Sequence, residues 1–487
     1  MLDKIKKSLK HTAIYSLGNV AAKLIGIILL PIYTAYFTVA DYGVLGILEV
    51  TIAIFTQVLL LGQPASYLRY FHARETKQQQ KSTFFTIFIF LFGMTAGLLL
   101  IGNLLIPKAA EMFERSALFE AYLKLCSYVI FFRVMNHFSM TVLRAKEKSG
   151  FYAVSSVIKI LSTLLFTIYF VVFAQLGIKG IFYAYIIGEV LLTIILLPTI
   201  LGEISPTFDK KLFYASLAFG FPIIFSSLAS MLLNVGDRYI LKLLVNYKEV
   251  GLYDLGYRIA NMVNVFLIQP FLLGFLPQAY KIYGKDGDKR YYSKMLTYVV
   301  FGLCWVGLAV AMSGKFIVET LSSKPEFYPA YQIIPIIVFA NVFNGAKTVL
   351  NIGMFLKERT RYVAYATSFA ALLNIGLNFA LIPPFGMKGA ALATVIAFLA
   401  FDILSYIFSN QFYPIPYELF KIFKMLMVGI VLFAGSQFAT GLSAVSEIAI
   451  KAGLWLAFPF MLYFWKFFEP VELDRLKNFV EKFPRKG

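Results

Sequence analysis

The feature that most constrains this chain is a series of about 14 apolar segments, each long enough to cross a lipid bilayer, which takes roughly 20 residues. Only 15% of its residues are charged, whereas about a quarter are charged in a soluble domain. We therefore expect an all-α polytopic membrane protein. The predicted spans are residues 12–36, 43–68, 83–106, 118–143, 151–174, 178–201, 213–245, 251–276, 295–319, 330–356, 362–383, 388–410, 418–440 and 444–465.

Lysine and arginine are distributed unevenly between the loops that join these spans. The N-terminus, the even-numbered loops and the C-terminal tail are rich in them, as in the loop that holds Arg144, Lys146 and Lys148. The odd-numbered loops hold few, such as Lys179 and Lys388. Basic loops tend to stay in the cytoplasm. We therefore expect a multi-pass protein of the cytoplasmic membrane with both termini in the cytoplasm, which requires an even number of helices.

The two ends of the chain differ from the spans. At the N-terminus, the basic stretch MLDKIKKSLKH precedes an apolar run longer than the roughly 7–15 residues of a secretory signal, so an uncleaved first helix is expected. At the C-terminus, Leu473, Leu476, Val480 and Phe483 fall on one helical face. This pattern predicts an amphipathic helix at the cytoplasmic membrane surface, with a soluble stub as the alternative.

The sequence contains an internal repeat. DYGVLGILE begins at Asp41 and EVGLYDLGY begins 208 residues later at Glu249, and the stretches LGIKGIFYA and FGMKGAALA place Gly177 and Gly386 209 residues apart. The spacing predicts two six-helix lobes, residues 1–208 and 209–415, followed by two additional helices in 416–466 and the tail 467–487. Because six is even, both lobes would have the same orientation, related by an axis along the membrane normal.

A lysine lies in the middle of the first predicted span. Lys23 is about 11 residues, or ~16 Å, from either end of its helix, too far for its side chain to reach the membrane surface easily. A lysine that faces lipid costs about 2.5–3.5 kcal/mol on insertion scales. Lys23 is therefore expected to face protein or water, on a polar stripe that also holds Ser16 and Asn19.

Similar polar stripes occur on other predicted helices, including pairs that the repeat makes equivalent. Together they predict a polar cavity between two halves, lined by one face from each. The candidate residues, beside Lys23 and Asn19, are Glu49 in the second helix, Asn234, Asp237 and Arg238 in the seventh, Asp254 and Arg258 in the eighth, and Asn344 and Lys347 in the tenth.

Two interpretations of these stripes remain open. Serine, threonine and asparagine stripes also hydrogen-bond helices to one another, whereas intramembrane charges are usually functional. Asp254 and Arg258, four residues apart, could also simply neutralise each other. Both interpretations also remain open for the other charged residues inside spans, where Arg133 and Lys159 could join a cavity and Glu189 and Asp402 could be structural partners.

Several classes of function are excluded. The net charge of +19 does not indicate nucleic-acid binding, because the basic residues are confined to short loops. No GxxxxGK[ST] phosphate loop is present, and no loop is large enough for a glycosyltransferase site. The 3 histidines and 2 cysteines are scattered, which predicts neither a metal site nor a disulfide. We expect a protein that is not an enzyme and has no cofactor.

Two stretches carry a family resemblance: YSLGNVAAKLIGIILLPIYTAYFTVADYGVLGILE and NVGDRYILKLLVNYKEVGLYDLGYRIA. With Asp–Tyr–Gly at 41–43, Gly–Asp–Arg at 236–238 and Val–Gly–Leu–Tyr at 250–253, they resemble the polysaccharide-transporter branch of the multidrug/oligosaccharidyl-lipid/polysaccharide exporter superfamily. The resemblance covers essentially the whole chain, including the plan of six, six and two helices.

The resemblance implies a flippase for an undecaprenyl-pyrophosphate-linked oligosaccharide, such as an O-antigen, capsule or exopolysaccharide repeat unit. The two lobes would form a V-shaped bundle whose cavity opens to each side of the membrane in turn. Four cations, Lys23, Arg238, Arg258 and Lys347, would neutralise the pyrophosphate, and Asn19, Asn234 and Asn344 would contact the substrate. A polysaccharide polymerase or synthase would be a partner.

The energy for transport would have to come from outside the chain. A bound sodium ion or proton needs an acidic site, for which Asp237, Asp254 and Glu49 are the candidates. The membrane potential could also drive movement, at about 2.3 kcal/mol per charge per 100 mV.

Three alternatives remain open at this stage. A multidrug or cation antiporter of the same superfamily would need an acidic cavity, whereas basic residues outnumber acidic ones inside the predicted spans. A lipid II flippase would share the pyrophosphate chemistry. A non-transporting scaffold of a polysaccharide synthase would leave the orientation of lipid-linked sugars unchanged.

Overall fold

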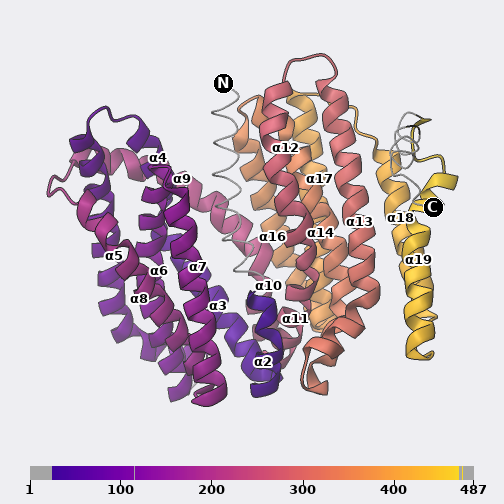
Figure 1. Cartoon of the computed structure of the whole chain (residues 1–487), viewed down its shortest axis with the longest axis horizontal. Coiled ribbons are helices and arrows are strands. Elements are labelled where there is room, and N and C mark those ends of the chain that lie inside the picture. The colour runs from indigo at the N-terminus through magenta and orange to yellow at the C-terminus, as the bar shows by residue number, and fades with distance from the viewer. Residues whose placement is uncertain (1–24, 114–115, 471–473, 475–487) are drawn as a thin grey trace, which may run out of the picture. The chain divides into compact units, whose positions relative to one another are not determined.

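The computed structural model of the protein describes residues 25–113, 116–470 and 474, and within these ranges every regular element is a helix (Figure 1). The elements are α2 Leu30–Tyr36, α3 Val39–Leu60, α4 Gln63–His72, α5 Lys77–Phe113, α6 Ala117–Ala145, α7 Ser149–Ile168, η1 Tyr169–Phe173, α8 Gly177–Glu203, α9 Lys210–Val235, α10 Asp237–Leu244, α11 Tyr247–Ala260, η2 Asn264–Ile268, α12 Gln269–Ile282, α13 Asp288–Leu321, η3 Pro325–Ile333, α14 Ile334–Leu350, α15 Ile352–Leu356, α16 Thr360–Phe385, α17 Met387–Phe412, α18 Leu419–Gln437 and α19 Ala444–Phe464.

In the described part of the chain, 12 helical segments are long and apolar enough to cross a membrane. They coincide with twelve of the predicted spans. The two other predicted spans are α6, which is 29 residues long and carries several charged side chains, and the first span, of which the structure describes the apolar helix Ile25–Tyr36. The expectation of an all-α polytopic membrane protein is thus confirmed.

The chain packs as two compact units. One unit comprises the described residues up to Leu255 together with Glu319–Ala330 and Thr367–Ala393. The other comprises Gly256–Val318, Tyr331–Ala366 and the described residues from Thr394 onward. This division groups residues by packing and not by sequence similarity, so the predicted boundaries of the two repeats stay a prediction. The predicted amphipathic helix of the tail lies almost wholly outside the described residues.

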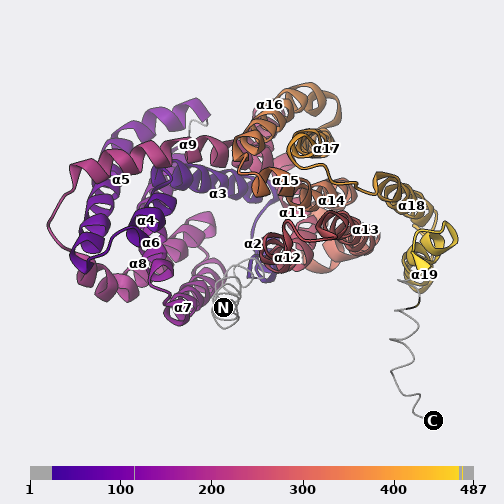
Figure 2. The same ribbon diagram turned by 90° about the horizontal axis from the view of Figure 1, so that it is seen from above.

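In the first unit, local signals in the sequence set the starts of the long helices. Thr38 and Asp41 form a reciprocal capping box at the start of α3, with each side chain accepting a backbone N–H of the other. Ser116 caps α6, and Asp209 caps α9 by accepting the N–H of Leu212 at 2.9 Å. The helices then pack closely: α8 contacts both α6 and α7, and α6 also contacts α3 and α5 (Figure 2).

The helices α3 and α11 cross at two glycines. A methyl group at Gly43 would overlap the carbonyl oxygen of Tyr247, and a methyl group at Gly251 would overlap the carbonyl oxygen of Val39. The contact is reciprocal. Gly43 and Gly251 are 208 residues apart, and so are Val39 and Tyr247, and this spacing is the offset of the repeat. Only glycine lets the two backbones approach this closely.

In the second unit, the last two described helices pack against each other, and α19 also packs on α13. Trp305 and Trp455 stack with their ring centroids 5.1 Å apart. Each indole N–H donates to the backbone carbonyl of the other tryptophan, at 3.3 Å and 2.9 Å. This reciprocal pair attaches α19 to α13, and α18 contacts α19 in turn.

We predict that Gly43→Ala destabilises the protein, because the added methyl group forces the backbones of α3 and α11 apart. Overpacking of this kind costs about 1–3 kcal/mol, more than the gain of up to ~1 kcal/mol from replacing glycine in a helix. Thermal unfolding of the purified protein in detergent measures the effect. Gly93→Ala in α5, where no atom lies within 4 Å of the added methyl group, is the matched control. Equal melting temperatures for both variants would contradict the tight crossing.

Candidate functional site

Two of the predicted site residues, Lys23 and Asn19, lie outside the described residues. Six of the other eight lie on helices long enough to span a membrane, and Asp237 and Arg238 lie on the short helix α10. Five of them, Glu49, Asn234, Asp237, Arg238 and Asp254, belong to the first unit, and Arg258, Asn344 and Lys347 belong to the second.

In the first unit, Arg238 lies at the centre of a buried ionic cluster. Its Nε donates to Asp254 at 3.1 Å, and its terminal nitrogen donates to Asp237 at 2.9 Å and to the backbone carbonyl of Asn234 at 3.2 Å. Tyr253 donates its hydroxyl to Asp237, and its ring lies 5.3 Å from the guanidinium carbon. The structure therefore brings together four predicted residues and adds Tyr253, which the sequence did not single out.

The local sequence explains how this cluster forms. The long helix α9 ends at Val235 and α10 begins at Asp237, so the helix is interrupted next to the charged side chains of Asp237 and Arg238. On the facing helix α3, Gly46 has no side chain, and a Cβ there would lie 3.5 Å from the carboxyl carbon of Asp254. Near the cluster, Thr51 and Tyr239 share a hydrogen bond of 2.6 Å. Small residues on α3 thus leave room for the charges of α10 and α11.

The charge balance of this cluster bears on its predicted role. One guanidinium faces two carboxylates, and the exposed fractions of Arg238, Asp237 and Asp254 are 3%, 1% and 5%. A cation bound by Asp237 or Asp254 would compete with Arg238, and an anion bound by Arg238 would compete with both carboxylates. The predicted roles of these residues in substrate binding and ion coupling stay predictions.

A second ionic cluster in the same unit lies on α6, α7 and α8. Glu189 is almost completely buried, and its carboxylate accepts from Arg133 Nε at 3.1 Å, from Lys159 Nζ at 2.6 Å and from Asn136 Nδ2 at 2.9 Å. Glu49, an ion-coupling candidate, accepts the hydroxyl of Tyr185 at 2.6 Å. The sequence leaves the roles of Arg133 and Lys159 open. It did not single out Asn136, although Asn136 follows Arg133 by three residues and so shares its helical face.

The second unit holds Lys347 and Asn344 on α14. Lys347 Nζ lies 5.9 Å from the centre of the Phe398 ring and interacts electrostatically with Asp402 on α17. Asn344 and Asp402 are both buried, and one side-chain oxygen of each has no hydrogen-bond partner within the described ranges. Arg258, on α11, is half-buried. The pairing of Arg258 with Asp254 stays a prediction, and Asp254 accepts a hydrogen bond from Arg238.

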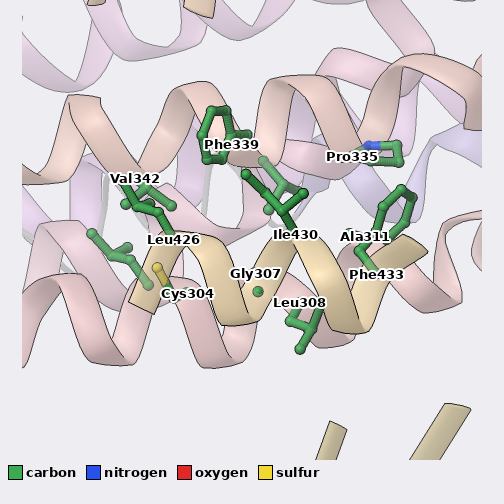
Figure 3. A pocket seen from close by; sticks show the side chains of 13 residues that line it. Cys304, Gly307, Leu308, Ala311, Pro335, Phe339, Val342, Leu426, Ile430 and Phe433 are labelled. Atoms are coloured by element: carbon green, nitrogen blue, oxygen red, sulfur yellow. The ribbon is translucent and has the colours of Figure 1, made fainter. Parts of the chain in front are cut away.

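An apolar cavity of about 120 Å³ lies in the second unit between α13, α14 and α18 (Figure 3). Its lining includes Cys304, Phe339 and Ile430 and contains no charged side chain. A pyrophosphate or a sugar would find no hydrogen-bond partner among these side chains, so this cavity is not the predicted polar site. Among the described residues, no three histidine, cysteine or acidic side chains are grouped so that they could hold a metal ion.

We predict that Arg238→Met lowers the stability of the protein, because it removes the guanidinium that the buried carboxylates of Asp237 and Asp254 share. Breaking a buried ion pair from one side typically costs about 3–5 kcal/mol. Thermal unfolding in detergent provides the measurement. The control is Arg74→Met, which removes a pair of 3.0 Å with Asp209 whose side chains are each about a third exposed, at an expected cost of ~1 kcal/mol or less. If the two variants melt alike, the Arg238 cluster does not contribute to stability as described.

Comparison with known proteins identifies the family. Residues 8–282, more than half of the chain, match the model of a family described as "Polysaccharide biosynthesis protein". No curated protein gave a sequence match.

Solved structures share the fold. A structure titled "Lipid II flippase MurJ, inward closed conformation" superposes with a TM-score of 0.76 at 14% identity, covering 93% of this chain and 99% of that one. An inward-facing multidrug resistance transporter of the MATE family and MOP superfamily gives a TM-score of 0.64 at 14% identity, covering 85% and 96%. A MOP superfamily transporter from Pyrococcus furiosus gives 0.59 at 13% identity, covering 83% and 95%.

The predicted family is therefore confirmed, and the solved structures share the predicted fold of a polytopic helical membrane protein. The structural likenesses extend over nearly the whole of the solved chains, and the family model covers most of the first unit. The chain belongs to the polysaccharide biosynthesis protein family, and its multi-pass helical fold is similar to those of a lipid II flippase and of a MATE family transporter.

Proposed function

We propose that the protein is a flippase that moves an undecaprenyl-pyrophosphate-linked oligosaccharide across the cytoplasmic membrane by alternating access. The oligosaccharide would be a repeat unit of an O-antigen, a capsule or an exopolysaccharide. The observation that carries the proposal is the set of cationic side chains deep within membrane-spanning helices of a polysaccharide biosynthesis family member. Arg258, for example, lies 11 residues, or roughly 16 Å, from the start of the segment Tyr247–Ile282.

The negative charge of the pyrophosphate-linked substrate determines what the protein must supply. A pyrophosphate carries at least two negative charges, and moving it through a low-dielectric region is prohibitively costly without counter-charges. Lysine and arginine supply them, and charge-assisted hydrogen bonds to phosphate are stronger than neutral ones. We assign this role to Lys23, Arg238, Arg258 and Lys347, with Asn19, Asn234 and Asn344 contacting the substrate beside them.

Coupling to an energy source requires a group that changes its partner during transport. Asp237 and Asp254 share Arg238, and Glu49 accepts a hydrogen bond from a neutral tyrosine. We propose that one of these carboxylates binds a sodium ion or a proton, or that the membrane potential acts on the charges directly. In this proposal the protein resides in the cytoplasmic membrane with both termini in the cytoplasm, and it works beside a polysaccharide polymerase or synthase.

The proposal predicts that the purified protein, reconstituted in liposomes, moves a pyrophosphate-linked oligosaccharide between leaflets. Lys23→Ala is expected to lower the initial rate at least tenfold, because a lost charge-assisted hydrogen bond is worth about 1.5–3 kcal/mol. The readout is the fraction of substrate that a sugar-binding probe outside the liposomes can reach over time.

Lys179→Ala, in a loop predicted to face outward, is the control and should retain the wild-type rate. Movement of lipid II alone would make the protein a lipid II flippase. Uptake of cationic dyes without movement of either lipid would favour the antiporter and overturn the proposal.

A further inference from the structure

The cluster around Glu189 lies near the middle of three membrane-spanning helices. Glu189 is 12 residues after the start of α8, Lys159 is 10 residues after the start of α7, and Arg133 is 12 residues before the end of α6. At 1.5 Å per residue these positions are roughly 14–18 Å from the nearer helix end, because Lys159 is 9 residues before the end of α7. Charges at this depth must face protein or water, because exposure to lipid is costly.

The two cations of this cluster share a single carboxylate. Arg133 and Lys159 both donate to the same oxygen of Glu189, whose other oxygen accepts from Asn136. Within the described part of the chain, the Glu189 cluster therefore pairs two cations with one carboxylate and holds an excess of positive charge.

Most hydrogen-bond donors of the two cations are unused. A guanidinium has five N–H donors and an ammonium has three. Within the part of the chain that the structure describes, Arg133 donates one hydrogen bond, through Nε, and Lys159 donates one. Their side chains are 32% and 28% exposed, whereas Glu189 is 1% exposed. The carboxylate of Glu189 thus lies on the buried side of the two cations, and their remaining donors are accessible.

The face of α7 that holds Lys159 also carries polar side chains. Tyr152, Ser155, Ser156 and Thr163 lie three, four or seven residues from the lysine. Most of the large exposed apolar side chains of this helix lie on the other side, namely Phe151, Val154, Val157, Ile158, Leu161 and Leu165, whereas Phe166 lies on the same face as Lys159. That apolar face suits contact with lipid, so the accessible donors of Lys159 point away from it.

Arg133 and Arg144 lie on the same side of α6, with His137 between them. From Arg133, the exposed positions His137 and Arg144 follow at helical spacing toward the end of the helix, which leads into the loop predicted to be cytoplasmic. His137 interacts electrostatically with Arg144, Lys159 and Glu189. Tyr185, on α8, places its ring 5.9 Å from the Arg133 guanidinium and donates its hydroxyl hydrogen to Glu49 on α3.

We propose that Arg133 and Lys159, held in place by Glu189 and Asn136, form an anion-binding site for the phosphate groups of the transported lipid. The site rests on the proposed function and adds two residues to it that were not assigned there. Arg144, exposed nearer the end of α6 that is predicted to be cytoplasmic, adds a positive charge on the same side of the helix that attracts the anionic headgroup. A guanidinium binds phosphate through two parallel hydrogen bonds, and the ammonium adds a point charge beside it.

The close packing of α7 and α8 is what brings Lys159 to Glu189. A methyl group at Gly188 would overlap the hydroxyl of Thr163, so the residue preceding Glu189 must be small for the two helices to approach. A cluster whose only task was to neutralise Glu189 would need one cation. The second cation is held at mid-membrane depth at a cost that a bound anion offsets.

The first test compares Lys159→Met with the wild type in the reconstituted flipping assay over a range of substrate concentrations. We expect the KM for the pyrophosphate-linked oligosaccharide to rise about tenfold or more, because one charge-assisted contact is lost. Lys159→Arg should restore most of the affinity. Lys124→Met on α6, which removes a more exposed pair with Glu120, is the matched control and should leave the KM unchanged.

The second test measures binding without transport, which separates failure of the site from failure of the proposed function. Thermal unfolding of the purified full-length protein is followed with undecaprenyl pyrophosphate and, separately, with inorganic pyrophosphate. Stabilisation of the wild type by the lipid that is lost in Lys159→Met supports the site, whether or not the protein flips the oligosaccharide. If Lys159→Met does not accumulate, Lys159→Met combined with Glu189→Gln removes one charge of each sign and serves in its place.

Two results would overturn the inference. One is an unchanged KM in Lys159→Met and in Arg133→Gln while the wild type flips its substrate, which would make the cluster purely structural. The other is stabilisation by inorganic pyrophosphate alone, which would make this a site for soluble phosphate.

Discussion

The cost of holding charge in a low-dielectric membrane is the constraint on which the rest of this structure depends. An unpaired ion at that depth is destabilising by several kcal/mol. The described mid-membrane charges in the first unit therefore occur in clusters rather than singly: Arg238 with two carboxylates, and Glu189 with two cations.

Small residues allow these clusters to form. Glycine at position 46 makes room beside Asp254, and glycine at position 188 lets α8 approach α7 so that Lys159 reaches Glu189. The reciprocal crossing of Gly43 and Gly251 brings the backbones of α3 and α11 into contact. The helices are thus spaced by backbone contacts, and the long cationic side chains bridge between them. Close approach through small residues is a common means of association for helices in lipid.

Much of the fold could be predicted from the sequence, because an apolar segment of about 20 residues has few alternatives to a membrane-spanning helix. Most of the spans follow from local patterns, whereas the seventh predicted span, 213–245, is divided in the structure between α9 and α10. The pairing of charges does not follow from local patterns. Glu189 receives its cations from residues 30 and 56 positions earlier in the chain, and Arg238 reaches Asp254 across 16 positions. Such partners are fixed by helix packing, which a hydropathy pattern does not encode.

The central claim is that this transporter recognises its cargo through the negative charge of a phosphate-linked lipid. The most direct measurement compares two substrates in the same proteoliposomes: an oligosaccharide joined to undecaprenol through pyrophosphate, and the same oligosaccharide joined through an uncharged linkage. The account predicts that the pyrophosphate-linked form changes leaflets and that the uncharged form does not. Equal rates for both forms would contradict it, because the mid-membrane cations would then play no part in recognising the substrate.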